Sequence, residues 1–303
     1  MRIVTLGTSA GRPTPHRSAS AAALEFDGDV FLFDCGEGTQ AQLARSPLKW
    51  GNIRAIFIGH LHGDHVNGLP GLLGTYSLAD RQEPLHLFGP PGLKKYLRVL
   101  QEVKTLWVNF PFRVTEITAP GVILDDKKFQ VETARLDHVI ECWGYVFREK
   151  QRPGVFDEAK AQAMGIPIGP LRSKLVHGES ITLENGLVIQ PGEIVGPPRP
   201  GRSVAYCLDT CPCQNDWKLA SEVDVLIHEA TFDDSLRNEM KKWGHSTSAQ
   251  AAEVALKARA NQLILTHISP RYANPDLLLK EAQRVFKNSE MAWDLSEFTV
   301  ERK

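Results

Sequence analysis

Apolar and polar positions alternate along the first half of the chain in a way that predicts short strands separated by turns. The predicted strands are RIVTLG (2–7), AAALEF (21–26), VFLFDCG (30–36), IRAIFIGH (53–60), LHLFGP (85–90), FRVTEI (112–117), FQVETARLDH (129–138) and CWGYVFRE (142–149). The second and third of these strands read as a hairpin. Between the fifth and the sixth, PPGLKKYLRVLQEV (90–103) predicts a helix with proline in its first turn.

The last third returns to the same pattern after an irregular segment. Strands are predicted at 203–209, 223–231 and 262–269, and helices at 246–260 and 275–286. Strands followed by helices in both halves, with hairpins among them, predict an α/β fold of stacked sheets covered by helices. We expect one domain over residues 1–303.

The segment 150–202 has a different character, because proline and glycine dominate it outside one short predicted helix, DEAKAQAMG (157–165). It lacks a dense apolar face, so we interpret it as a flexible arm inserted into the domain.

Composition and charge narrow the class of protein. A chain of 303 residues with 42% hydrophobic and 23% charged residues is typical of a soluble globular protein. The formal net charge of −1 excludes a global basic footprint, so attraction to nucleic acid would need local patches or metal ions. Without a signal-peptide pattern or a membrane-length apolar run, and with five cysteines, a cytoplasmic location and no membrane partner are expected.

The stretch GHLHGDH places three histidines and an aspartate, His60, His62, Asp64 and His65, directly after an apolar strand. Such a cluster without a metal would leave histidines repelling one another or lacking hydrogen-bond partners. A tight turn aims neighbouring side chains at two nearby points, as a two-metal site requires. Imidazole and carboxylate ligands suit zinc, with manganese or iron as competitors.

Three more candidates stand at the ends of apolar runs: His138, Asp209 and His267. A lone histidine at a strand end is usually a hydrogen-bonded surface residue, but three such placements beside the histidine-rich turn favour a shared metal site. Four cysteines near Asp34 and Asp209 are interpreted as packing residues, since CLDTCPC lacks C-x-x-C spacing: Cys35, Cys207, Cys211 and Cys213.

HLHGDH resembles the signature of the metallo-β-lactamase superfamily, a four-layer αββα sandwich that binds one or two metals at a sheet edge. More narrowly, the chain resembles the ribonuclease Z family, endonucleases that trim tRNA 3′ trailers. The motifs that carry this resemblance occur in order: LGTSAG, LFDCGEGTQ (32–40), GHLHGDH, GLPGLL, HEAT (228–231), GHS (244–246) and THIS followed by RY (266–272).

The resemblance implies two Zn²⁺ ions per subunit, with Mn²⁺ or Co²⁺ as substitutes. One ion would be held by His60, His62 and His138, the other by Asp64, His65 and His267, and Asp209 would bridge them. The aspartate matching Asp64 also takes the proton of the attacking water in that family.

His245 is the candidate general acid for the leaving ribose 3′-oxygen, with Glu229 orienting it. It precedes a predicted helix for which Ser246 is a plausible N-cap. The alternative is that His245 only fixes the end of this helix.

RNA contacts are expected from the arm, whose basic residues are Lys150, Arg152, Lys160, Arg172 and Lys174. The resemblance implies that the arm is an exosite for the tRNA elbow, and that in a homodimer it serves the partner's active site. A solvated surface loop is the alternative. Many family members also carry a Pro-x-Lys-x-Arg-Asn loop, of which residues 13–18 keep Arg17, a further expected substrate contact, but not the lysine or the asparagine.

Together with the metal site and the arm, the resemblance implies an endoribonuclease that cleaves the 3′ trailer from precursor tRNA, leaving a 3′-hydroxyl on the tRNA and a 5′-phosphate on the trailer. Two alternatives stay open: a hydrolase of a small phosphodiester or other ester, and an RNA-binding module without catalysis.

Overall fold

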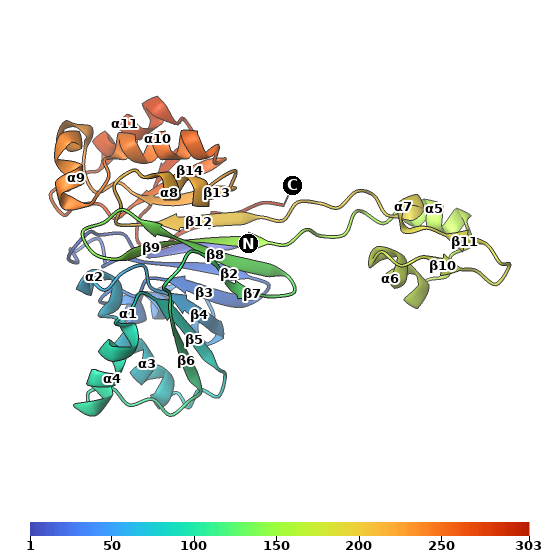
Figure 1. The fold of residues 1–303 in the computed structure, drawn as a ribbon, viewed down its shortest axis with the longest axis horizontal. Helices are drawn as coiled ribbons and strands as arrows, with labels where there is room; N and C mark the ends of the chain where they lie inside the picture. The colour runs from blue at the N-terminus through green and yellow to red at the C-terminus, as the bar shows by residue number, and fades with distance from the viewer. Residues whose placement is uncertain (303) are drawn as a thin grey trace. The chain divides into compact units, whose positions relative to one another are not determined.

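Two seven-stranded sheets pack face to face in the computed structural model, which describes residues 1–302 (Figure 1). The first sheet has the order β16-β1-β2-β3-β4-β5-β6, with β1 Arg2–Gly7, β2 Ala21–Phe26, β3 Asp29–Phe33, β4 Ile53–Phe57, β5 Leu85–Gly89, β6 Phe112–Glu116 and β16 Ser296–Thr299. The second has the order β15-β14-β13-β12-β9-β8-β7, with β7 Gly121–Asp125, β8 Phe129–Leu136, β9 Cys142–Glu149, β12 Ser203–Cys207, β13 Val225–Glu229, β14 Gln262–Thr266 and β15 Ser289–Met291.

Helices cover the outer face of each sheet, which confirms the predicted four-layer αββα sandwich (Figure 1). The first sheet carries α1 Thr39–Arg45, α3 Leu69–Leu78 and α4 Leu93–Glu102, and the second carries α8 Gln214–Leu219, α10 Ser248–Ala258 and α11 Asp276–Val285. Short helical turns lie in the connections: η1 Trp50–Asn52, α2 Gly63–Val66, η2 Asp234–Glu239 and α9 Met240–Trp243. Among residues 1–302, none of the helices combines the length and apolar character needed to cross a membrane.

Successive residues of the central strands face different cores, which is why these strands read as nearly continuous apolar runs. In β1, Ile3 faces the layer between the sheets and Val4 faces the helices. The inter-sheet layer is rich in aromatic rings, and Phe129 stacks on Phe147 with 4.7 Å between ring centroids. The sandwich is therefore a rigid support for the loops at its edge.

The parallel strands fix where those loops lie. β3, β4 and β5 run parallel in the first sheet, and β12, β13 and β14 run parallel in the second. Their carboxyl ends carry most of the predicted metal and catalytic residues. In open α/β sheets this edge is where ligands bind.

Residues 149–202 form a second compact unit, separate by its internal contacts from the unit of Met1–Arg148 and Ser203–Glu301. It contains α5 Glu158–Ala163, α6 Pro170–Val176, β10 Ile181–Thr182, β11 Val188–Ile189 and α7 Pro191–Ile194. The expectation that this segment lacks an apolar face is corrected. Single apolar residues from different elements meet in a small buried cluster: Ala161, Ile166, Leu175, Ile181, Ile189 and Ile194.

Two predicted helix starts are also corrected. The helix expected from Pro90 begins at Leu93, because Gly92 adopts φ +104 as its N-cap and leaves both prolines outside the helix. The N-cap of α10 is Thr247, not Ser246: the Thr247 hydroxyl accepts from the Gln250 amide, and the Gln250 side chain accepts from the Thr247 amide.

Candidate metal centre

The structure brings together all seven residues predicted as metal ligands, at one edge of the sandwich. His60 follows β4, His62 precedes α2, and Asp64 and His65 lie within α2. The other three come from loops after β8, β12 and β14: His138, Asp209 and His267.

Four of these side chains face one point. The His62 Nδ1 atom lies 3.0 Å from His60 Nε2 and 3.3 Å from His138 Nε2. The Asp209 Oδ2 atom lies 3.6 Å from His60 Nε2 and 3.9 Å from His138 Nε2.

A second group forms on the other oxygen of the same carboxylate. Asp209 Oδ1 lies 3.3 Å from His65 Nε2 and 3.2 Å from His267 Nε2. Asp64 Oδ2 lies 3.4 Å from His65 Nε2 and 3.5 Å from His267 Nε2. Asp209 therefore presents one oxygen to each group.

Both groups fit a divalent metal ion. Ligand atoms arranged tetrahedrally at about 2.1 Å from a zinc ion lie about 3.4 Å from one another, and the separations above cluster around that value. Three of the inward atoms, His65 Nε2, His267 Nε2 and Asp209 Oδ1, are buried without a hydrogen-bond partner in the structure. A cation supplies what these atoms lack, since buried polar atoms otherwise cost free energy.

The charge state of Asp209 favours cation binding as well. Burial alone would raise the pKa of its carboxyl, but His267, His65 and His60 around it outweigh burial and hold the pKa well below the usual range. Asp209 is thus a carboxylate.

A second layer of hydrogen bonds fixes the ring orientations. His65 Nδ1 lies 2.8 Å from Asp34 Oδ2, and the other Asp34 oxygen accepts from the Gly59 amide at 2.7 Å. His267 Nδ1 lies 2.9 Å from the Thr231 hydroxyl oxygen, and that hydroxyl donates to Glu229. Such partners fix which ring nitrogen faces a metal.

His138 is held by a backbone group. Its Nδ1 atom lies 2.7 Å from the carbonyl oxygen of Gly244, which has φ +73 and ends helix α9. A Cβ atom at Gly244 would lie 2.6 Å from His138 Nδ1.

Three residues at the site have a left-handed backbone conformation: Asp34 at φ 56, Asp209 at φ 53 and His267 at φ 56. L-residues adopt this region at a cost in free energy, and functional sites tolerate that cost where it aims a side chain. All three residues directly follow strands or come two residues later.

His245 and Glu229 lie beside the metal-facing residues. His245 Nδ1 is 3.1 Å from Glu229 Oε1, and Glu229 also accepts from the amides of Thr210 and Ser246 at 2.6 and 2.9 Å. Burial opposes the charged form of His245, but Glu229, aided by Asp209, outweighs it and raises the pKa of His245 to about 9. The side chain of His245 is 18% exposed, and its contact with Glu229 uses Nδ1.

Asp64 is positioned by the N-terminal loop. The Gly11 amide donates to Asp64 Oδ2 at 2.7 Å. The loop is tied at both ends to Asp294, which accepts from the Thr8 hydroxyl at 2.7 Å and from the Ser18 amide at 2.6 Å.

The sequence reasoning missed several of these supporting residues. Asp34 follows an apolar strand in the same way as Asp209, so the strand-end pattern could have identified it. Gly11 and Gly244 lie in the motifs LGTSAG and GHS, but nothing in the sequence showed their contacts with Asp64 and His138, and Asp294 gave no signal.

The expectation that Arg17 contacts substrate is corrected. Its side chain is buried, donates to the Thr8 hydroxyl and the Ala292 carbonyl, and stacks on the Trp293 ring at 4.0 Å. Burial lowers its pKa to about 10.

The five basic arm residues predicted to contact RNA differ in their exposure and in their existing contacts. Arg172 donates to the Ile166 carbonyl and pairs with Glu158, and Arg152 lies 3.8 Å from Glu149. Lys160 and Lys174 are exposed, whereas Lys150 is half-buried.

The cysteines do not join the site among residues 1–302. Cys35 and Cys207 lie in the two helix-facing cores, which confirms that they pack, and burial raises the pKa of both thiols. Cys211 and Cys213 lie in the loop between β12 and α8 and are free thiols.

Comparison with known proteins decides the family. Residues 1–143 match the family model of the anti-Pycsar protein Apyc1, and residues 170–268 match that of the beta-lactamase superfamily domain. Ribonuclease Z of Bacillus thuringiensis (strain Al Hakam) is 45% identical, with 100% of each chain covered. The chain belongs to the ribonuclease Z family. A second ribonuclease Z, from Cyanothece sp., is also 45% identical over 100% of this chain and 96% of its own.

Solved structures agree with this family. The human tRNase Z short form has 31% identity and a TM-score of 0.71, covering 99% of this chain and 100% of its own. The metallo-beta-lactamase fold protein YhfI from Bacillus subtilis, at 17% identity and TM-score 0.71 with 98% of each chain covered, shares the fold. As a member of the ribonuclease Z family, the chain is a metal-dependent nuclease whose His/Asp cluster fits a divalent metal.

The support of His138 by Gly244 generates a prediction. We expect Gly244→Ala to weaken divalent-metal binding at least about tenfold, because the added Cβ displaces His138 and alanine strains a backbone at φ +73. Competition with a chromogenic chelator measures the affinity. Gly74→Ala is the matched control, since a Cβ there meets nothing within 4 Å. Equal metal affinity in the two variants would contradict the role of Gly244.

Proposed function

We propose that the protein is a zinc-dependent endoribonuclease that removes the 3′ trailer from precursor tRNA, leaving a 3′-hydroxyl on the tRNA and a 5′-phosphate on the trailer. The observation that carries this proposal is the pair of atom groups sharing Asp209, in a chain 45% identical over its full length to ribonuclease Z proteins. The human tRNase Z similarity supports tRNA as the substrate. A homodimer in the cytoplasm is part of the proposal.

The proposed ligands follow from the two groups. One zinc ion would be held by His60, His62 and His138, and the other by Asp64, His65 and His267, with Asp209 contributing an oxygen to each. Mn²⁺ or Co²⁺ could substitute, since these ligands suit all three metals. When bound, such ions neutralise the phosphate and lower the pKa of a water molecule.

The chain's own residues would move the protons. Asp64 Oδ2 is occupied by the Gly11 amide and faces His65, so we assign its Oδ1 atom to accept the proton of the attacking water. Water oxygen then bonds to phosphorus while the bond from phosphorus to the ribose 3′-oxygen breaks.

His245 would protonate that 3′-oxygen from Nε2. Its Nδ1 side is occupied by Glu229, a buried carboxylate that stabilises the imidazolium and fixes the ring. The raised pKa keeps His245 in its acid form at neutral pH.

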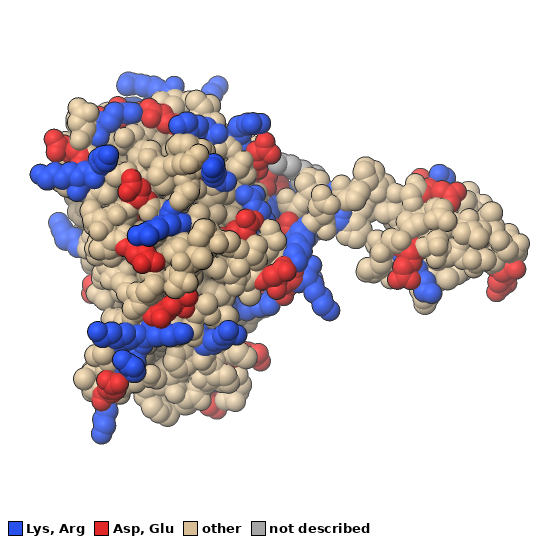
Figure 2. Space-filling view, viewed as in Figure 1, with Lys and Arg blue, Asp and Glu red and all other residues tan. Residues whose placement is uncertain are grey.

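The arm would hold the RNA largely by shape. Figure 2 shows acidic as well as basic side chains on the arm, and Arg172 is already paired with Glu158. Exposed apolar side chains are more prominent: Ile168 is 88% exposed and Val155 65% exposed. Lys160 and Lys174 remain as candidate phosphate contacts.

Incubation with end-labelled precursor tRNA tests the function. We expect release of an intact trailer, complete loss of release with a chelator, and recovery on adding Zn²⁺. Turnover of bis-p-nitrophenyl phosphate without trailer release would instead favour a small-ester hydrolase. Binding of precursor tRNA without cleavage in the presence of Zn²⁺ would favour a non-catalytic RNA-binding module.

Replacement of His245 tests the general acid. We expect His245→Ala to lower kcat about 10²–10⁴-fold with unchanged zinc content. In the parent enzyme the rate should fall as rising pH deprotonates His245, and this fall should be absent in His245→Ala. His177→Ala, at an exposed arm histidine, is the control. A His245→Ala protein with full turnover and the parental pH profile would exclude this role.

Excision of the arm tests the exosite. The Glu149 amide donates to the Arg202 carbonyl at 2.8 Å, so a two-residue turn can replace residues 150–201. We expect precursor tRNA cleavage to fall at least about tenfold while small-phosphodiester turnover is retained.

The same variant tests exchange between subunits. Mixing the armless protein with His245→Ala should restore tRNA cleavage, because a homodimer can combine the arm of one subunit with the active site of the other. Equal loss on both substrates, without complementation, would count against the exosite.

A further inference from the structure

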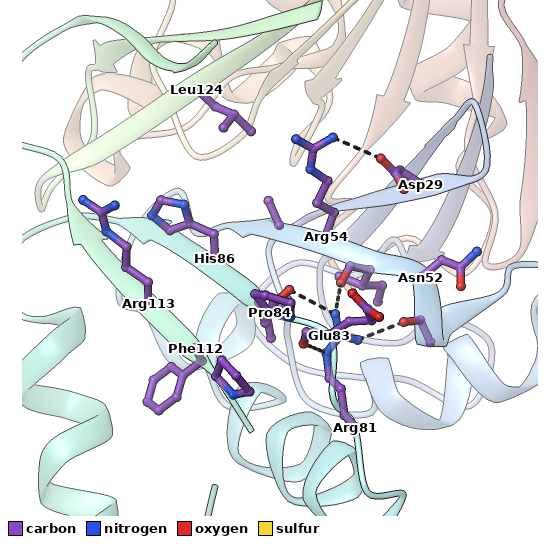
Figure 3. A pocket seen from close by; sticks show the side chains of 15 residues that line it. Asp29, Asn52, Arg54, Arg81, Glu83, Pro84, His86, Phe112, Arg113 and Leu124 are labelled. Carbon is purple, nitrogen blue, oxygen red and sulfur yellow. Dashed lines mark hydrogen bonds and ion pairs between the residues drawn. The ribbon is translucent and has the colours of Figure 1, made fainter. Parts of the chain in front are cut away.

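A pocket lies at the opposite ends of the strands that carry the metal-facing loops. It opens at the amino ends of β4, β5 and β6, whereas His60 follows the carboxyl end of β4. Its volume is about 880 Å³, within the range of ligand-binding pockets (Figure 3). No step of the proposed reaction uses it.

One row of cross-strand neighbours forms the centre of the pocket. Ala55 pairs with His86, and His86 pairs with Arg113, so the three side chains share one face of the sheet. Ala55 offers only a methyl group, which leaves space beside His86. Figure 3 shows His86 and Arg113 next to each other, with Leu124 across the opening and Arg54 along the neighbouring strand.

The arginines of the pocket differ in how their charges are balanced. Arg54 is fixed between Asp29 at 3.1 Å and Asp126 at 2.8 Å. Arg81 donates to the backbone carbonyls of Gly51, Ile53, Glu83 and Pro84, so most of its guanidinium is already hydrogen-bonded. Arg113 is exposed and forms no ion pair with any residue from 1 to 302.

His86 is prepared to donate a hydrogen bond. Its Nε2 atom lies 2.8 Å from the Thr115 hydroxyl oxygen, and its ring stacks on Phe88 at 3.8 Å between centroids. The Thr115 hydroxyl can donate to Nε2, and we assign this tautomer, in which Nδ1 carries the proton of the neutral ring. Burial, joined by the charge of Arg113, lowers the pKa of His86 to about 4, so the ring is neutral at neutral pH and Arg113 supplies the positive charge beside it.

We propose that this pocket binds a phosphate group, held by the Arg113 guanidinium and the His86 ring. A tetrahedral dianion suits this pair, since guanidinium groups bind phosphate through paired N–H donors. The phosphate could belong to a free mononucleotide or to the backbone of an RNA. Phe112, Pro84 and Leu124 provide apolar surface for the attached nucleoside.

The acidic residues of the pocket contact arginines other than Arg113. Asp29 pairs with Arg54, which it shares with Asp126, and Glu83 lies beside Arg81 (Figure 3).

Histidine-selective NMR of the zinc-loaded full chain tests the proposal, because it separates this pocket from the metal centre. Inorganic phosphate, AMP and tRNA are titrated in turn, and the His86→Gln spectrum identifies the His86 signal. We expect phosphate or AMP to shift that signal, and Arg113→Gln to weaken the binding at least about tenfold. The matched control is Arg98→Gln, which removes an exposed arginine on α4 outside the pocket.

The three ligands of the titration distinguish the sources of the phosphate. Tighter binding of AMP than of inorganic phosphate supports a mononucleotide. A shift with tRNA that Arg113→Gln removes, with kcat for trailer release unchanged, supports an RNA backbone. A His86 signal unmoved by all three ligands, or equal affinities for Arg113→Gln and Arg98→Gln, would overturn the proposal. Trailer release is a separate assay, so this result leaves the proposed function intact.

Discussion

The buried Asp209 carboxylate is the group around which the site is organised. Its two oxygens face different sets of histidines, and its own backbone is held at φ 53 after β12. A carboxylate at this depth is stable only with opposite charge beside it. Protonated histidines could provide that charge, but several imidazolium ions so close together would repel one another. Metal cations resolve both problems at once.

Hydrogen bonds from supporting residues set the orientation of three of the metal-facing rings. Asp34 fixes His65, Thr231 fixes His267, and the Gly244 carbonyl fixes His138, each through the ring nitrogen that faces away from the centre. Glu229 supports both a metal-facing ring and the candidate general acid, because it accepts hydrogen bonds from Thr231 and from His245. The proposed proton donor and a proposed metal ligand are thus tied to one buried carboxylate. A substitution of Glu229 would therefore affect both His245 and His267.

The sequence was most informative where a side chain follows an apolar strand. His138, Asp209 and His267 were found in this way, because the end of an apolar run marks the sheet edge. Contacts between distant segments were not predictable: Gly244 meets His138 across 106 positions and Thr8 meets Asp294 across 286. No periodic pattern records such contacts.

Two further errors have the same origin. The arm core was missed because each of its elements contributes only one or two apolar residues, too few for a periodic signal. Arg17 was assigned to substrate from its match to the family's Pro-x-Lys-x-Arg-Asn loop, while its side chain is buried and stacks on Trp293, far along the chain. The four-layer order of the sandwich came from family resemblance, since strand periodicity alone does not say which sheets face each other.

Because the net charge of the chain is −1, attraction of a polyanion such as RNA must come from local positive groups and not from the charge of the whole protein. The metal edge carries the carboxylates of Asp64 and Asp209 among its histidines, so cations bound there would offset this negative charge and attract a phosphate. The arm offers exposed apolar surface such as Ile168 rather than a dense positive patch. Arg113, at the far end of the parallel strands, adds an unpaired positive charge. Recognition of RNA by this protein would therefore depend on a few discrete contacts, with less reliance on the long-range field that basic RNA-binding proteins use.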